Sequence, residues 1–78
     1  MKILCFGIAK ELTGSSELDV HSADISNVQA LRTFLLHKFP EFGKYKKYMI
    51  AVNQEYAGDE RSLQESDEIA IIPPVSGG

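Results

Sequence analysis

The segment from Ser26 to Phe39 carries the clearest structural signal in this chain of 78 residues. Ser26 and Gln29 have the spacing of a capping box, which predicts where a helix begins. Pro40 ends it, because the residue before a proline is pushed out of the α-helical region. We therefore predict one long helix whose apolar stripe, widened by Phe34, packs on a sheet. The residues of the stripe recur at helical spacing and are Val28, Leu31, Leu35 and Phe39.

Five segments with strand character accompany this helix, at residues 2–6, 17–20, 48–52, 55–57 and 68–72. The first two are expected to form a hairpin, joined by a wide turn that contains a short helical piece. The last is the most apolar, so we place it in the middle of the sheet, parallel to the first and buried on both faces. This order predicts an α+β fold, a ubiquitin-like β-grasp, in which a mixed sheet curls around one main helix.

Six residues follow the last strand, Pro73-Pro74-Val75-Ser76-Gly77-Gly78. Prolines cannot donate to a sheet ladder, so the strand ends at Ile72 and the chain leaves as a stiff, extended spacer of roughly 20 Å. Glycines fit a narrow channel and leave the last carbonyl carbon open to a nucleophile. We predict a domain at 1–72 and an extended functional C-terminal segment at 73–78, called the tail below. The alternative is an end without function, since chain termini are commonly disordered.

Charge and length limit the classes of partner. The formal net charge is −3 and the pI is near 5.2, which argues against nucleic acid and favours a basic docking surface. One domain of this size has little room for a deep, enclosed active site. The apolar run at residues 3–9 is too short for a transmembrane helix and lacks a signal-peptide cleavage pattern. We therefore expect a cytoplasmic protein with no membrane partner.

Side chains for autonomous chemistry are not apparent in the sequence. Cys5 lies within a predicted strand and is expected to be a buried, unreactive hydrophobe. His21 and His37 are far apart, and no cluster has the spacing of metal ligands. The sequence also lacks a Ser/His/Asp arrangement, a P-loop and a dinucleotide-binding fingerprint. We expect no metal, no bound cofactor and no self-sufficient enzyme.

The stretch from Asp67 to Gly78 resembles the C-terminal signature of the MoaD family, the small, sulfur-carrying subunits of molybdopterin synthase. The Pro-Pro, the small residues and the final Gly-Gly make this likeness specific. Phe6–Gly14 is similar to the exit of the family's first strand, and Ala51–Gln54 is similar to the end of its third strand. The chain departs from the family at 65–67, where Glu-Ser-Asp replaces a pattern that often has glycine between acidic residues.

The resemblance implies that Gly78 is the reactive residue, with Gly77 beside it. A MoeB-like adenylating enzyme would use ATP and Mg²⁺ to join the Gly78 carboxylate to AMP, and a sulfur donor protein would convert it to a thiocarboxylate. The tail would then enter the large, MoaE-like subunit and give its sulfur to a cyclic pyranopterin precursor in molybdenum cofactor biosynthesis. In the family, two small and two large subunits form a heterotetramer. The resemblance places the catalytic side chains in the large subunit.

A partner of this kind needs an apolar surface near the base of the tail. If Ile69 and Ile71 face the helix, strand alternation places Ile72 and Phe6 on the opposite face. The alternative is that these residues simply close the core. The predicted partner-binding residues are Phe6, Tyr56, Ile72, Pro73, Pro74, Val75 and Ser76.

Two other functions remain open at this stage. One is a sulfur carrier of another pathway, such as the ThiS-like carrier of thiamine synthesis, which generally lacks the Pro-Pro. The other is a ubiquitin-like binding module whose tail does no chemistry.

Overall fold

The computed structural model describes residues 1–21, 23, 25–45 and 47–73. Strands and helices follow one another in the order that the sequence predicts, and a short 3₁₀ helix, η2, is added after the main helix. The elements are β1 (Lys2–Cys5), α1 (Ile8–Thr13), β2 (Glu17–Asp19), α2 (Val28–Lys38), η2 (Pro40–Lys44), β3 (Met49–Val52), β4 (Glu55–Tyr56) and β5 (Glu68–Ile72).

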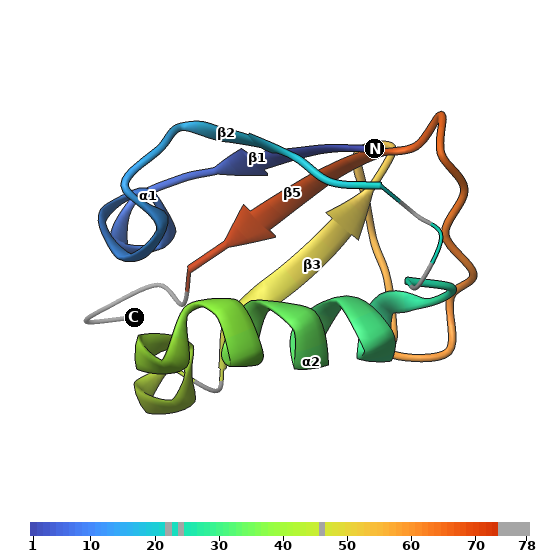
Figure 1. Cartoon of the computed structure of the whole chain (residues 1–78). Helices are drawn as coiled ribbons and strands as arrows, with labels where there is room; N and C mark the ends of the chain where they lie inside the picture. The colour runs from blue at the N-terminus through green and yellow to red at the C-terminus, as the bar shows by residue number, and fades with distance from the viewer. Residues whose placement is uncertain (22, 24, 46, 74–78) are drawn as a thin grey trace.

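The described strands form one mixed sheet in the order β2-β1-β5-β3-β4. β5 lies in the middle, parallel to β1 and antiparallel to β3, as the sequence predicts. β1 and β2 form the expected antiparallel hairpin, with α1 between them. Figure 1 shows α2 crossing one face of the sheet, while β1 and β5 run side by side toward the end where α1 lies. This arrangement is the predicted ubiquitin-like β-grasp.

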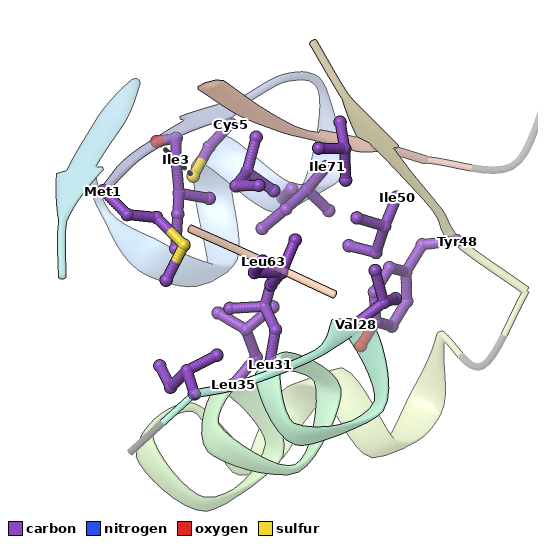
Figure 2. Close-up of a cluster of buried hydrophobic side chains, with 14 of the residues drawn as sticks. Met1, Ile3, Cys5, Val28, Leu31, Leu35, Tyr48, Ile50, Leu63 and Ile71 are labelled. Atoms are coloured by element: carbon purple, nitrogen blue, oxygen red, sulfur yellow. Dashed lines mark hydrogen bonds between the residues drawn. The ribbon is translucent and has the colours of Figure 1, made fainter. Parts of the chain in front are cut away.

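The core lies between the sheet and α2. Alternation along the strands points Ile3, Ile50 and Ile71 toward the helix, and all three are almost completely buried. Leu31 and Leu35 meet them from α2, and Figure 2 shows these side chains converging. Burial of each such side chain contributes roughly 1.5–3 kcal/mol. The rest of the buried cluster is Met1, Cys5, Ala9, Ile25, Val28, Phe42, Tyr48, Val52, Leu63 and Ile69.

The start of α2 differs from the prediction by one residue. Asn27, and not Ser26, is the N-cap, and its Oδ1 accepts a hydrogen bond from the Ala30 N–H at 2.8 Å. Asn27 also forms a β-bridge with Ser62, so the chain before the helix is held in an extended conformation. The Ser26 carbonyl accepts from the Leu63 N–H within the same contact. The pairing with Ser62 makes Asn27 the N-cap in place of Ser26, and the local sequence does not reveal this pairing.

The segment after α2 contributes to the core, although the sequence does not predict a regular element there. Its 3₁₀ helix buries Phe42, whose ring packs edge-on against Phe39 and Tyr48 at centroid distances of 6.2 and 5.3 Å. Arg32 covers the Tyr48 ring, with its guanidinium carbon 4.7 Å from the ring centroid. Aromatic packing therefore closes the end of the core beyond α2.

The prediction that β5 is buried on both faces is wrong. Ile69 and Ile71 are fully buried against α2, whereas Ala70 and Ile72 are only partly buried on the opposite face. The apolar run suggested two covered faces, but α2 covers only one face of the sheet. The other face remains available for contact with a partner.

A candidate docking face at the base of the tail

One side of the sheet is not covered by α2, and the half of that side next to the tail is apolar. We call this apolar half the open face. Strand register defines it: Ile72 pairs with Met49, and Ala70 pairs with both Ala51 and Leu4. Phe6 follows the inward-pointing Cys5 and therefore points outward, beside Ile72. The open face consists of Leu4, Phe6, Met49, Ala51, Tyr56, Ala70 and Ile72.

Large apolar side chains are concentrated on this face. Phe6 is 50% exposed, Met49 46% and Tyr56 67%. Among the described residues, the one other large hydrophobic side chain this exposed is Leu36 of α2, at 48%. The open face also holds a hollow of about 400 Å³, lined by Phe6, Tyr56 and Ile72 among others. A cluster of this kind, rimmed by polar residues, is typical of a protein-binding surface.

The end of the same face away from the tail is acidic. Cross-strand pairing places Asp19 and Glu68 on either side of Lys2, and Glu17 pairs with the next outward residue, Leu4. The Lys2 Nζ lies 3.8 Å from a Glu17 carboxylate oxygen. The three carboxylates therefore outnumber the two nearby ammonium groups, that of Lys2 and the N-terminal one, which lies 3.8 Å from Asp19 Oδ1. This charge favours a partner with a basic rim beside its apolar contact surface.

The base of the tail is fixed by the sheet. Ile72, the last residue of β5, still pairs with Met49, and Pro73 follows it as the last residue that the structure describes. The structure thus places Phe6, Tyr56 and Ile72 around one hollow. Pro73 follows directly after Ile72, at the end of the central strand. The other predicted tail residues lie outside the described residues: Pro74, Val75, Ser76, Gly77 and Gly78.

Sequence reasoning missed part of the open face. Met49, Leu4, Ala51 and Ala70 all belong to it, yet none was named as a contact residue. Alternation within the predicted strands was sufficient to point Met49 and Ala51 outward. It did not give the register between strands, which is what gathers these residues into one surface.

Outside the open face, the described residues include one buried cysteine and a second hollow. Within 1–21, 23, 25–45 and 47–73, no group of three His, Cys, Asp or Glu residues could hold a metal ion. Burial raises the pKa of the Cys5 thiol, although a hydrogen bond from Thr13 opposes the shift. A larger hollow of about 630 Å³ lies beside α2, near Phe34 and His37, on the side of the sheet away from the open face. None of the described helices is long and apolar enough to cross a bilayer.

The chain matches a known protein family over nearly its whole length. The model of the ThiS family matches residues 3–78, which is nearly the whole sequence. The chain belongs to the ThiS family. Among curated relatives, the molybdopterin synthase sulfur carrier subunit of Caenorhabditis briggsae is 43% identical over 81 aligned positions, covering 100% of this chain and 96% of the relative. The resemblance to the MoaD family that the sequence suggested is thereby confirmed.

Solved structures confirm the fold of this ThiS-family chain. SAMP1 from Haloferax volcanii superposes with a TM-score of 0.82 at 25% identity, covering 100% of this chain and 98% of that one. One chain of a complex of subunits 1 and 2 of the molybdopterin-converting factor from Helicobacter pylori superposes with a TM-score of 0.69 at 23% identity, covering 99% and 96%. Both likenesses extend over the complete β-grasp.

Proposed function

We propose that this chain is the sulfur-carrier subunit of a molybdopterin synthase. The observation that carries the proposal is the position of the open face, which lies at the point where β5 ends and the tail begins. A partner that docks there is within reach of the tail, since six extended residues span roughly 20 Å. The names of the relatives support the same assignment.

The first chemical step is activation of the Gly78 carboxylate. A carboxylate is ionised at neutral pH, and it resists attack by a nucleophile. A MoeB-like adenylating enzyme supplies ATP and Mg²⁺: a carboxylate oxygen forms a bond to the α-phosphorus, and pyrophosphate leaves with the electrons of the broken P–O bond. The product is a mixed anhydride of Gly78 and AMP. The partner's cations and Mg²⁺ offset the charge of the phosphates.

The second step replaces oxygen by sulfur. A sulfur nucleophile from a donor protein, or hydrosulfide in a simple assay, attacks the acyl carbon, and AMP departs as the C–O bond breaks. With hydrosulfide, one proton is lost and the product is the Gly78 thiocarboxylate. Its sulfur is a far better nucleophile than a carboxylate oxygen, so it can attack a carbon of the pyranopterin precursor: a C–S bond forms while a C–O bond of the precursor breaks, and the oxygen leaves with the bonding electrons. Hydrolysis of the resulting thioester leaves sulfur on the precursor and restores the Gly78 carboxylate.

The large, MoaE-like subunit is the partner in which this transfer takes place. The Helicobacter pylori neighbour is itself one component of a two-subunit complex, which supports a partner of this type. We propose that the open face contacts the large subunit and that the tail enters its active site, with two chains of each kind in the assembly. ATP and Mg²⁺ belong to the activating enzyme, and the whole cycle runs in the cytoplasm.

A second candidate is a thiocarboxylate carrier for another pathway, because the matching family model is that of ThiS. The carrier chemistry on Gly78 is the same in both candidates. They differ in the acceptor, so transfer of sulfur to a pyranopterin precursor in the presence of a large subunit separates them.

The experiment that tests the proposal is intact-mass spectrometry after incubation with ATP, Mg²⁺, a MoeB-like enzyme and a sulfide source. We expect a mass increase equal to sulfur replacing one oxygen, mapped to the C-terminal peptide. A variant lacking Gly78 is the matched control and should gain nothing. Absence of the shift in the unaltered chain, while a known carrier is converted in the same tube, would leave only a binding-module function.

A further inference from the structure

We propose that Gly7 is a positioning residue that forms a seat for the Pro73 ring and thereby sets the direction in which the tail leaves the domain. This inference deepens the proposed function and rests on it for its consequence in catalysis. Gly7 has no reactive group and acts only through Pro73.

The seat is a direct contact between two neighbouring strand ends. Cys5 pairs with Ile71 in the parallel ladder of β1 and β5, so two further residues on each strand bring Gly7 beside Pro73. A Cβ at residue 7 would lie 3.0 Å from Pro73 Cγ and 3.9 Å from Pro73 Cβ. The proline ring therefore occupies the space that any other residue at position 7 would need.

The backbone of Gly7 is held in place from the other side. Its φ of +55° belongs to a region that residues with a Cβ rarely adopt. Its carbonyl accepts hydrogen bonds from the Lys10 and Glu11 N–H groups at 3.1 and 3.4 Å, at the start of α1. Because α1 holds Gly7, a clash at this position would be relieved mainly by movement of Pro73.

Pro73 is the residue at which the direction of the tail is decided. Ile72 is the last residue that the ladder holds, and Pro73 has no N–H with which to continue it. The ring contact with Gly7 provides a second constraint one residue later. A rotation at Pro73 changes the direction in which the chain continues beyond the last described residue, and with it the approach of Gly78 to a partner. Misplacement of a reacting group by about 1 Å can slow a reaction by up to roughly a hundredfold.

The chain contains a matched control in Gly14. Gly14 also has a positive φ, +75°, but a Cβ built on it meets nothing within 4 Å. Gly14 lies in the left-handed αL region, with ψ of 12°, whereas Gly7 has ψ of −127°, so a side chain at residue 14 meets less backbone strain than one at residue 7 and makes no contact with the tail. Gly14 therefore controls for a side chain at a positive-φ glycine, and removal of the Pro73 ring separates the backbone strain at Gly7 from the loss of the seat.

The experiment measures the steady-state kinetics of Gly78 thiocarboxylation for the full chain and the variants Gly7→Ala, Gly7→Val, Gly14→Ala and Gly14→Val. We expect kcat to fall with size at position 7, about threefold for Ala and about tenfold for Val, with KM for the carrier changed less than about twofold. The Gly14 variants should keep both constants. Equal kcat values at the two positions would overturn the proposal.

A double-mutant cycle that combines Gly7→Ala with Pro73→Ala tests the seat even if the Gly7→Val variant does not fold. When the ring is absent, Gly7→Ala should no longer lower kcat, so the two changes should be strongly non-additive. Additive effects would show that residue 7 acts without Pro73 and would overturn the seat.

An NMR measurement separates this inference from the proposed function. Nuclear Overhauser contacts are expected between the Gly7 α-protons and the Pro73 ring protons of the free protein, and residual dipolar couplings of the tail should change in Gly7→Ala but not in Gly14→Ala. If these NMR results are obtained but no sulfur is incorporated at Gly78, the proposed carrier function is refuted and the contact between Gly7 and Pro73 is supported. Absence of the contact would overturn the seat, whatever the activity.

Discussion

The side chains of Asn53 and Asp67 are joined by a hydrogen bond of 2.9 Å from Asn53 Nδ2 to Asp67 Oδ1. Asn53 also accepts from the Glu68 N–H at 3.0 Å, and Asp67 accepts from the Gln64 N–H at 2.8 Å. These contacts tie the turn between β3 and β4 to the first residue of β5. These side-chain hydrogen bonds hold the start of β5, the end away from the tail, in addition to the hydrogen bonds of the sheet.

Acid should weaken this connection. Hydrogen bonds from the Gln64 N–H and the Asn53 side chain lower the pKa of the Asp67 carboxyl in the native state. Because the native pKa lies below the unfolded value of about 3.9, the stabilisation is present at neutral pH and disappears as the pH falls through the native pKa. We expect urea denaturation between pH 7 and pH 2 to show a larger loss of stability for the unaltered chain than for Asp67→Asn. Parallel curves would contradict this role of Asp67.

The neighbouring turn offers a stabilising substitution. Asn53 and Gln54 both have positive φ values, 51° and 70°, as in the two-residue hairpin turn that favours Asn-Gly. The left-handed conformation costs a residue with a Cβ roughly 1 kcal/mol. We expect Gln54→Gly to raise the free energy of unfolding by about 0.5 kcal/mol after the entropy cost of glycine. Gln64→Gly, outside this turn, is the control, and an equal gain there would refute the explanation.

Charge on the open face should block docking. Met49→Asp or Phe6→Asp places a carboxylate where an apolar partner surface is expected, and we predict at least tenfold weaker binding to the large subunit, about 1.4 kcal/mol or more. Leu36→Asp is the matched control, because Leu36 is similarly exposed but lies on α2. Isothermal titration calorimetry gives the affinities and thermal unfolding gives the stabilities. If affinity fell only in proportion to stability, these residues would belong to the core.

Cys5 should take no part in sulfur transfer. Its thiol is buried, and burial raises its pKa, so little thiolate is present at neutral pH. We expect iodoacetamide to modify Cys5 only in denaturant, and Cys5→Ala to gain sulfur at Gly78 as fast as the unaltered chain. Rapid alkylation of the native protein, or sulfur mapped to the Cys5 peptide, would contradict this expectation.

Features with a local physical cause could be predicted from the sequence. Alternation placed Phe6 on the face away from the helix, and the expected short helical piece in the turn after β1 is α1, which lies between Gly7 and Gly14. Pro40 ended α2, and the bounds of β5 agree with the prediction. In each case neighbouring residues restrict the backbone strongly enough that the rest of the chain does not override them.

Features that depend on distant partners could not be predicted. Asn27 is the cap because Ser62, far along the chain, pairs with it. Phe42 is buried because Tyr48 and Phe39 receive its ring. Met49 belongs to the open face through its pairing with Ile72. The roles of Gly77 and Gly78 stay predictions, as does the division of the chain at residue 72.

The central position of β5 also has a mechanical consequence. β5 leads directly into the tail, so a pull on the tail acts along the axis of this strand. Four register pairs with β1 and four with β3 resist that pull. Force in this direction loads the hydrogen bonds on both sides together, in shear, whereas an edge strand such as β4 can be peeled away one bond at a time. We therefore expect the domain to resist unfolding when force is applied at the C-terminal end of β5.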